Sequence, residues 1–218
     1  AWVDRLSWNP NGHWCAAACG RVLNCWNADA AEWHSCEPHG ATIADLAWSP
    51  KADTLASVSY GGVWLWTPGA RTPARRLEWK GSSLVVAWSP TAEYLATGDQ
   101  DASVHFWFVE NGKDARMWGY PAKVRELVWD ASGRYLATGG GPDVCVWDCS
   151  APGPEGRDPI LCQCGKSNVS ALAWSREHSL LAAGYRDGKV VFWQPTRTVL
   201  PMAEIKGDAE VVHLAWSP

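Results

Sequence analysis

The cysteines are the residues whose type and spacing could most readily do chemistry. The eight form two clusters of four along the chain: Cys15, Cys19, Cys25 and Cys36, then Cys145, Cys149, Cys162 and Cys164. Four thiols together suit tetrahedral zinc. However, no Cys-x-x-Cys pair occurs, and that spacing is what a zinc site usually shows. We therefore expect no metal site and mainly reduced thiols that pack as small apolar side chains. Zinc handling and a disulfide remain the alternatives.

Other catalytic motifs are sought without success. None of the six histidines lies in His-Glu-x-x-His or in a two-histidine metal spacing. The run Gly165-Lys166-Ser167 resembles the end of a phosphate-binding loop, but Ile160 stands where that loop needs glycine. We expect no enzyme and no cofactor. The alternative is an enzyme whose site gathers polar residues that are distant in the sequence, and its candidates are Asp4, Asp45, Glu126 and His213.

Tryptophan is the compositional outlier, with 17 copies against three Phe and five Tyr. In one series, each Trp is followed by a small or polar residue and often then by proline. This series comprises Trp8, Trp48, Trp88, Trp129, Trp174 and Trp216. Its spacings are 40, 40, 41, 45 and 42 residues. A second series follows the first by 18 or 19 residues: Trp26, Trp66, Trp107, Trp147 and Trp193. Such periodicity indicates a repeat architecture.

The elements that carry these tryptophans are predicted strands. Apolar residues alternate over 43–48 before the first Trp, and over 104–107 and 190–193 before the second. This period of two, rich in Val, Phe and Trp, is typical of β-structure. Ser-Pro ends the first strand in a turn, and pairs such as Gly61-Gly62 separate the second and third strands. Four short strands per repeat predict one blade of a β-propeller.

These residues give the chain a resemblance to WD40-repeat proteins. The period, the Leu-Ala-Thr-Gly segments at 95–98 and 136–139, and Trp147-Asp148 carry it. The resemblance implies an all-β propeller of four-stranded antiparallel blades, with five complete repeats and the inner strand of a sixth, from a seven-bladed ring. The Trp-Asp pair occurs once, and His39-Gly40 reverses the family's Gly-His. We therefore expect the family's Asp-His-Ser/Thr-Trp hydrogen-bond network to be incomplete.

The predicted organisation is one propeller domain over 1–218. Its blades are expected near 1–38, 39–79, 80–119, 120–165 and 166–207, with 208–218 as the inner strand of a further blade. We interpret the chain as an excerpt of a longer propeller, the alternative being a closed five-bladed ring. Open blade faces are apolar, so an excerpt is expected to self-associate.

Composition narrows the function classes. The 218 residues are 47% hydrophobic and carry a net charge of -4, which is globular and lacks a basic footprint for nucleic acid or an anionic membrane. We expect neither of these as a partner. Many thiols and no recognisable signal segment favour a reducing, cytoplasmic setting.

The expected function is a non-enzymatic scaffold that presents a propeller face to protein or peptide partners. Tyrosine and arginine are enriched at interaction hot spots. The candidate partner-binding residues lie in loops predicted to share one face: Tyr60, Lys80, Asp99, Gln100, Asp101, Tyr120, Lys166, Tyr185 and Arg186. A Pro- and Gly-rich insertion at 150–159, on the opposite face, is a second candidate because long loops often carry function.

Overall fold

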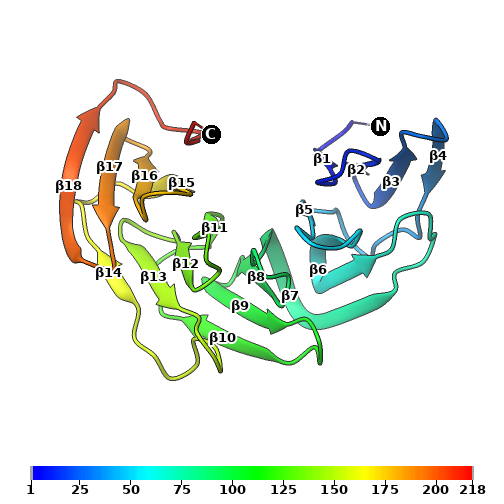
Figure 1. The fold of residues 1–218 in the computed structure, drawn as a ribbon, viewed down its shortest axis with the longest axis horizontal. Coiled ribbons are helices and arrows are strands. Elements are labelled where there is room, and N and C mark those ends of the chain that lie inside the picture. Colours follow the sequence, from blue (N-terminus) through cyan, green and yellow to red (C-terminus); the bar gives the residue numbers. More distant parts are fainter. Residues whose placement is uncertain (1, 218) are drawn as a thin grey trace. The chain divides into compact units, whose positions relative to one another are not determined.

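The computed structural model describes residues 2–217, and every regular element in them is a β-strand (Figure 1). The chain divides into two compact units. Unit 1 comprises residues up to 101 together with 107–113, and unit 2 comprises 102–106 together with the residues from 114 onward. Each unit is considered by itself. Among the described residues, no helix is long and apolar enough to cross a membrane.

Unit 1 begins with a four-stranded antiparallel sheet in the order β1-β2-β3-β4. Its strands are β1 (Arg5–Trp8), β2 (Trp14–Cys19), β3 (Val22–Asn27) and β4 (Glu32–Ser35). Four further strands are also consecutive neighbours: β5 (Asp45–Trp48), β6 (Leu55–Trp66), β7 (Arg75–Trp88) and β8 (Tyr94–Asp99). The tryptophans of both series in this unit lie at or near strand ends, as their spacing predicts.

Two of these strands are longer than the sequence predicts. Gly61 and Gly62, expected to form a turn, lie inside β6 with φ of 105° and 106°. A Cβ at Gly62 would stand 2.1 Å from the main-chain oxygen of Leu77 on β7. Only glycine accommodates both the positive φ and this close approach. The chain nevertheless reverses here as predicted, because the Ser57 hydroxyl lies 3.5 Å from the Trp64 carbonyl and accepts the Trp66 indole N–H at 2.8 Å. The two predicted strands therefore face each other within the span of β6, with no irregular residues at the turn.

Unit 2 contains two four-stranded antiparallel sheets. The first comprises β11 (Leu127–Trp129), β12 (Tyr135–Thr138), β13 (Val144–Asp148) and β14 (Ile160–Cys162). The second, labelled in Figure 1, comprises β15 (Val169–Trp174), β16 (Leu181–Tyr185), β17 (Lys189–Gln194) and β18 (Thr198–Lys206). β10 (Asp114–Trp118) also belongs here, and β9 (Ser103–Phe108) is divided between the units.

The prediction that the last residues form the inner strand of a sixth blade is wrong for the described residues. Residues 208–217 form no strand, although Val211 donates its amide to the Tyr185 carbonyl and Trp216 reaches the Ala173 carbonyl. A strand requires a ladder of backbone hydrogen bonds to a neighbour. No described segment offers that ladder, so the residues lie against unit 2 without regular structure. Residue 218, included in the prediction, lies outside the described residues.

The turns after three of the inner strands explain the residue that follows the first-series tryptophan. Asn9 accepts the Trp14 amide, Ser89 accepts the Tyr94 amide, and Asp130 accepts the Tyr135 amide, each five positions along. A short polar side chain satisfies this orphan donor without lengthening the loop. The small polar residue therefore stabilises the turn that connects two strands of one sheet.

Apolar side chains between the sheets form the core of each unit. The largest fully buried side chains include Trp66 and Trp107 in unit 1 and Trp193 and Tyr185 in unit 2. Burying aromatic side chains of this size stabilises the fold by a few kcal/mol each, on the order expected from area. The second Trp series thus supplies the core that the repeat predicts.

The hydrogen-bond network expected to be incomplete is partly built in the second repeat. His39 Nε2 lies 2.8 Å from the Ser57 hydroxyl, which also accepts the Trp66 indole N–H at 2.8 Å. The imidazole stacks on Trp64, with ring centroids 4.0 Å apart. Its Nδ1 has no partner among the described residues, so the acidic member of the network is missing there.

Candidate functional site

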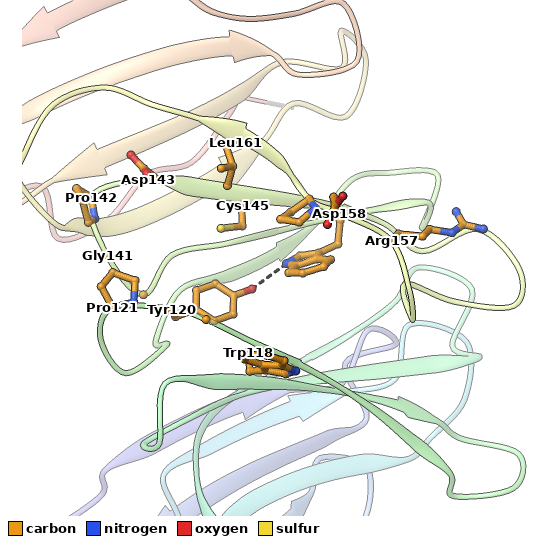
Figure 2. A pocket seen from close by; sticks show the side chains of 14 residues that line it. Trp118, Tyr120, Pro121, Gly141, Pro142, Asp143, Cys145, Arg157, Asp158 and Leu161 are labelled. Carbon is orange, nitrogen blue, oxygen red and sulfur yellow. Dashed lines mark hydrogen bonds between the residues drawn. The ribbon is translucent and has the colours of Figure 1, made fainter.

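A pocket of about 410 Å³ opens on unit 2, between the ends of β10 and β14 (Figure 2). It is lined by Trp118, Gly119, Tyr120, Pro121, Gly140, Gly141, Pro142, Asp143, Cys145, Trp147, Arg157, Asp158, Pro159 and Leu161. Three prolines, Pro121, Pro142 and Pro159, restrict the backbone around its mouth. Its size and mixed lining are within the range of pockets that bind small groups.

Two exposed apolar side chains face the pocket from opposite sides. Trp118, at the end of β10, is 77% exposed, and Leu161 on β14 is 44% exposed. Figure 2 shows the Tyr120 ring lying between them. Large apolar side chains held open on a folded surface mark interaction sites more often than isolated small ones do. The pocket can therefore receive an apolar side chain.

Tyr120 forms a rigid wall of the pocket. Its hydroxyl accepts the Trp147 indole N–H at 2.7 Å, drawn as a dashed line in Figure 2, and lies 2.8 Å from the Thr138 hydroxyl. Because Thr138 donates to the Cys145 carbonyl, we assign Tyr120 as the donor to Thr138. Burial raises the pKa of Tyr120, so the phenol stays protonated and fixed.

The rim carries charge. Arg157 lies 3.2 Å from Asp148 and also donates to the Ser150 hydroxyl at 2.6 Å, which fixes the insertion over 150–159 against β13. Asp143 accepts a hydrogen bond from Gln163 at 3.2 Å, and the exposed Asp158 follows Arg157 on the rim. Since Arg157 is already paired, the rim offers two carboxylates to an incoming cation.

The thiol and the carboxylates considered for catalysis are poorly suited to it. Cys145 is the thiol in the lining of the pocket, and burial raises the pKa of that thiol to about 11. A protonated, buried thiol is a poor nucleophile. Asp45 and Glu126, considered for an enzyme site, have carboxyl pKa values raised by burial. Asp45 is held by the Val86 amide and by Arg5 at 3.4 Å, which is a positioning role.

The structure divides the predicted partner-binding residues. Six side chains are exposed: Tyr60, Lys80, Gln100, Asp101, Lys166 and Arg186. Tyr60 and Lys80 line one hollow of about 460 Å³ in unit 1. Asp99 and Tyr185 are 0% and 1% exposed, so they cannot contact a partner directly. The exposed six remain predictions.

Sequence reasoning missed Trp118 and Leu161. Both lie on outer strands, whose pattern is irregular, and Trp118 belongs to neither tryptophan series. One signal was available: Trp118 belongs to neither repeating series, so the repeat does not require a tryptophan at this position. The insertion at 150–159 was singled out, and it contributes Arg157, Asp158 and Pro159 to the pocket.

The cysteine clusters are rearranged by folding. All eight thiols are free, and five of them are buried: Cys15, Cys25, Cys36, Cys149 and Cys162. In unit 1, the sulfurs of Cys25 and Cys36 gather with a ring nitrogen of His34, all within 4.8 Å of one another. His34 was not a candidate, because its cross-strand neighbour cannot be read from sequence.

Known proteins share this architecture. The family described as WD domain, G-beta repeat matches residues 78–107, 115–148 and 159–194. A chain from "Crystal Structure of Mitotic Checkpoint Complex" superposes with a TM-score of 0.84 at 22% identity, over 99% of this chain and 67% of that one. The computationally designed Ika8 protein gives 0.85 at 17% identity, over 100% and 66%.

Curated relatives are longer proteins. Protein HIR1 of Cryptococcus neoformans is 26% identical, over 82% of this chain and 23% of the relative. Protein FIZZY-RELATED 1 of Arabidopsis thaliana is 27% identical over 93% and 43%, and WD repeat-containing protein slp1 of Schizosaccharomyces pombe is 25% identical over 100% and 45%. The chain spans less than half the length of these relatives. Together with the sheets described above, the matches show that this chain carries WD40 repeats at three positions and has the β-propeller fold.

Proposed function

We propose that this chain is a non-enzymatic protein-interaction scaffold that binds an extended peptide segment at the pocket beside Trp118. The observation that carries the proposal is that two exposed apolar side chains, Trp118 and Leu161, line the same pocket. Prolines hold the backbone around the pocket rigid. Relatives named for the mitotic checkpoint complex and for WD repeats support a scaffold role. An apolar side chain of the partner would enter the pocket, where burial against aromatic rings contributes most of the affinity.

The rim suggests which residue accompanies that apolar side chain. Asp143 and Asp158 flank the mouth, while Arg157 is held by Asp148. A lysine or arginine next to the anchoring residue would pair with these carboxylates. Such rim charges contribute more to selectivity and to the association rate than to affinity. We therefore infer a partner segment with one apolar anchor and an adjacent cation.

The setting we propose is the cytoplasm. Eight free thiols support a reducing compartment.

Self-association remains a separate prediction. Leu6 and Trp8 on β1 are 62% and 49% exposed, and Leu200 on β18 is 70% exposed. Light scattering at several concentrations tests it, since a concentration-independent monomer would contradict it.

A peptide selection tests the proposed function. Short random peptides displayed on phage are selected on the immobilised chain, and the recovered peptides are measured for affinity. Trp118→Ala is expected to weaken binding about tenfold, near 1.4 kcal/mol. Trp33→Ala, at a 61% exposed Trp of unit 1, is the matched control. The proposal fails if no peptide is recovered, or if both variants bind equally well.

A second arm tests the rim. The double variant Asp143→Asn with Asp158→Asn should keep the apolar anchor and lose the preference for Lys or Arg beside it. Salt should weaken binding to the wild type more than to this variant, because screening acts on the charge pairs alone. A salt dependence identical in both would remove the cation from the proposed partner.

A further inference from the structure

We propose that Cys25, His34 and Cys36 bind a zinc ion in unit 1. These three ligand atoms lie within 4.8 Å of one another. The set combines two thiolate sulfurs with an imidazole nitrogen, which is a donor combination that zinc favours. The site is separate from the peptide pocket, which lies in unit 2, and it does not depend on the proposed function.

The strand register places the three side chains on one face. β3 and β4 are antiparallel, with Cys25 directly opposite His34. The ladder continues when the Cys36 amide donates to the Leu23 carbonyl at 2.8 Å. Side chains alternate along a strand, so His34 and Cys36, two positions apart, point to the same side as Cys25. The convergence is therefore a consequence of the sheet and not of a loop.

The distances suit a metal better than a disulfide. Tetrahedral zinc, with bonds of roughly 2.0 to 2.3 Å, brings its ligand atoms to about 3.5 to 3.8 Å from one another. Contraction from 4.8 Å needs only small side-chain rotations. Cys25 and Cys36 are a diagonal pair across the strands, and diagonal Cβ atoms stand roughly 7 Å apart. A disulfide needs Cβ atoms at about 3.8 Å, which would pull the ladder apart.

The imidazole supplies an independent observation. The Nε2 atom of His34 is buried and has no hydrogen-bond partner among the described residues. A buried polar atom without a partner costs free energy, typically by the loss of its hydration. A metal ion would satisfy this atom.

Two thiolates and one imidazole would form the ligand set. Zinc requires thiolates, and two of them would balance the charge of the ion. Cys15 lies opposite Trp26 while Ala16 lies opposite Cys25, so Cys15 points to the other face of the sheet. The described residues thus provide three ligands and leave the fourth position to water or another small ligand.

Metal content and a spectroscopic probe test the proposal. The chain is purified with zinc in the buffer, dialysed and measured for bound metal, and the metal-free chain is titrated with Co²⁺. The wild type is expected to hold about one zinc per chain and to give the intense visible bands of tetrahedral Co²⁺ with thiolate ligands. His34→Gln, which keeps both thiols, should weaken metal affinity at least about tenfold.

Matched controls keep the test decisive. Cys25→Ala with Cys36→Ala should abolish binding, whereas Cys15→Ala, at a buried thiol of the same sheet, should leave it unchanged. Circular dichroism checks that each variant folds. Zinc should raise the Tm of the wild type and of Cys15→Ala only. The proposal is overturned by absence of zinc and of the Co²⁺ bands in the wild type, by equal binding in His34→Gln, or by a Cys25–Cys36 disulfide in the isolated protein.

Discussion

The indole nitrogen of Trp48 donates a hydrogen bond of 3.0 Å to the main-chain oxygen of Ser7, on the inner strand one repeat earlier. The same bond recurs from Trp88 to Ala47 at 3.0 Å and from Trp216 to Ala173 at 3.1 Å. Each acceptor immediately precedes the first-series Trp of the previous repeat. The Trp spacing thus encodes a direct link between successive repeats within a unit.

Trp48→Phe should measure this link. The variant keeps an aromatic ring but removes the donor and leaves an acceptor without its partner. We expect a loss of about 2 kcal/mol in the free energy of unfolding, from the hydrogen bond and the smaller buried area. Urea unfolding measures it. Trp33→Phe, at a 61% exposed ring, should cost less than about 0.5 kcal/mol. Equal losses would show that the Ser7 bond adds nothing.

The positions of the repeated strands could be predicted from the sequence. The period-two pattern and the two Trp series place most inner, second and third strands, because those strands are buried and their pattern is constrained. Gly61-Gly62 was correctly predicted to reverse the chain, and both glycines have the positive φ that such a tight turn needs. The pocket at Trp118 and the group at His34 could not be predicted. Both depend on which residues face one another across strands, and cross-strand register is fixed by packing.

His39 should make stability depend on pH. Burial lowers its pKa to about 4 from 6.5. Between these values the unfolded chain binds a proton that the folded chain does not. The free energy of unfolding therefore falls as pH drops from 6.5 towards 4, by up to about 3 kcal/mol from this residue.

His39→Gln tests that assignment. Urea unfolding of the wild type and the variant at pH 7 and pH 4.5 gives the pH-dependent loss in each. We expect a smaller loss in the variant, which starts from a lower stability because the bond to Ser57 changes. His178→Gln, at an exposed imidazole, is the matched control. If both variants reduced the pH dependence equally, His39 would not be its source.

Tyr120→Phe should destabilise unit 2 without emptying its core. The ring remains, but the Trp147 indole loses its acceptor at 2.7 Å and Thr138 loses a partner at 2.8 Å. An unsatisfied buried donor costs about 1 to 3 kcal/mol. Thermal unfolding should show a lower Tm. Tyr135→Phe removes a hydroxyl from another half-buried ring on β12 and is the control. A Tm change no larger than in this control would contradict the bridging role of Tyr120.

Asp148 should hold the insertion over 150–159 in place. It pairs with Arg134 at 2.7 Å and with Arg157 at 3.2 Å, and it accepts the Ser150 amide at 3.0 Å. The hydrogen bond from Arg134 holds the pKa of the Asp148 carboxyl below its usual range. Asp148→Asn removes the charge that anchors both arginines. Because the pairs are partly exposed, the global cost should stay below about 1 kcal/mol.

The local effect of Asp148→Asn should be larger than the global one. Loops open by local unfolding, with little loss of the core. Amide hydrogen exchange in peptides covering 150–159 should accelerate, while exchange in β15–β18 stays as in the wild type. Asp208→Asn, at an exposed carboxylate, should change neither. Since Arg157 and Asp158 line the pocket, peptide binding should weaken together with the loop. Unchanged exchange with weakened binding would instead mean that Asp148 acts on the peptide through charge alone.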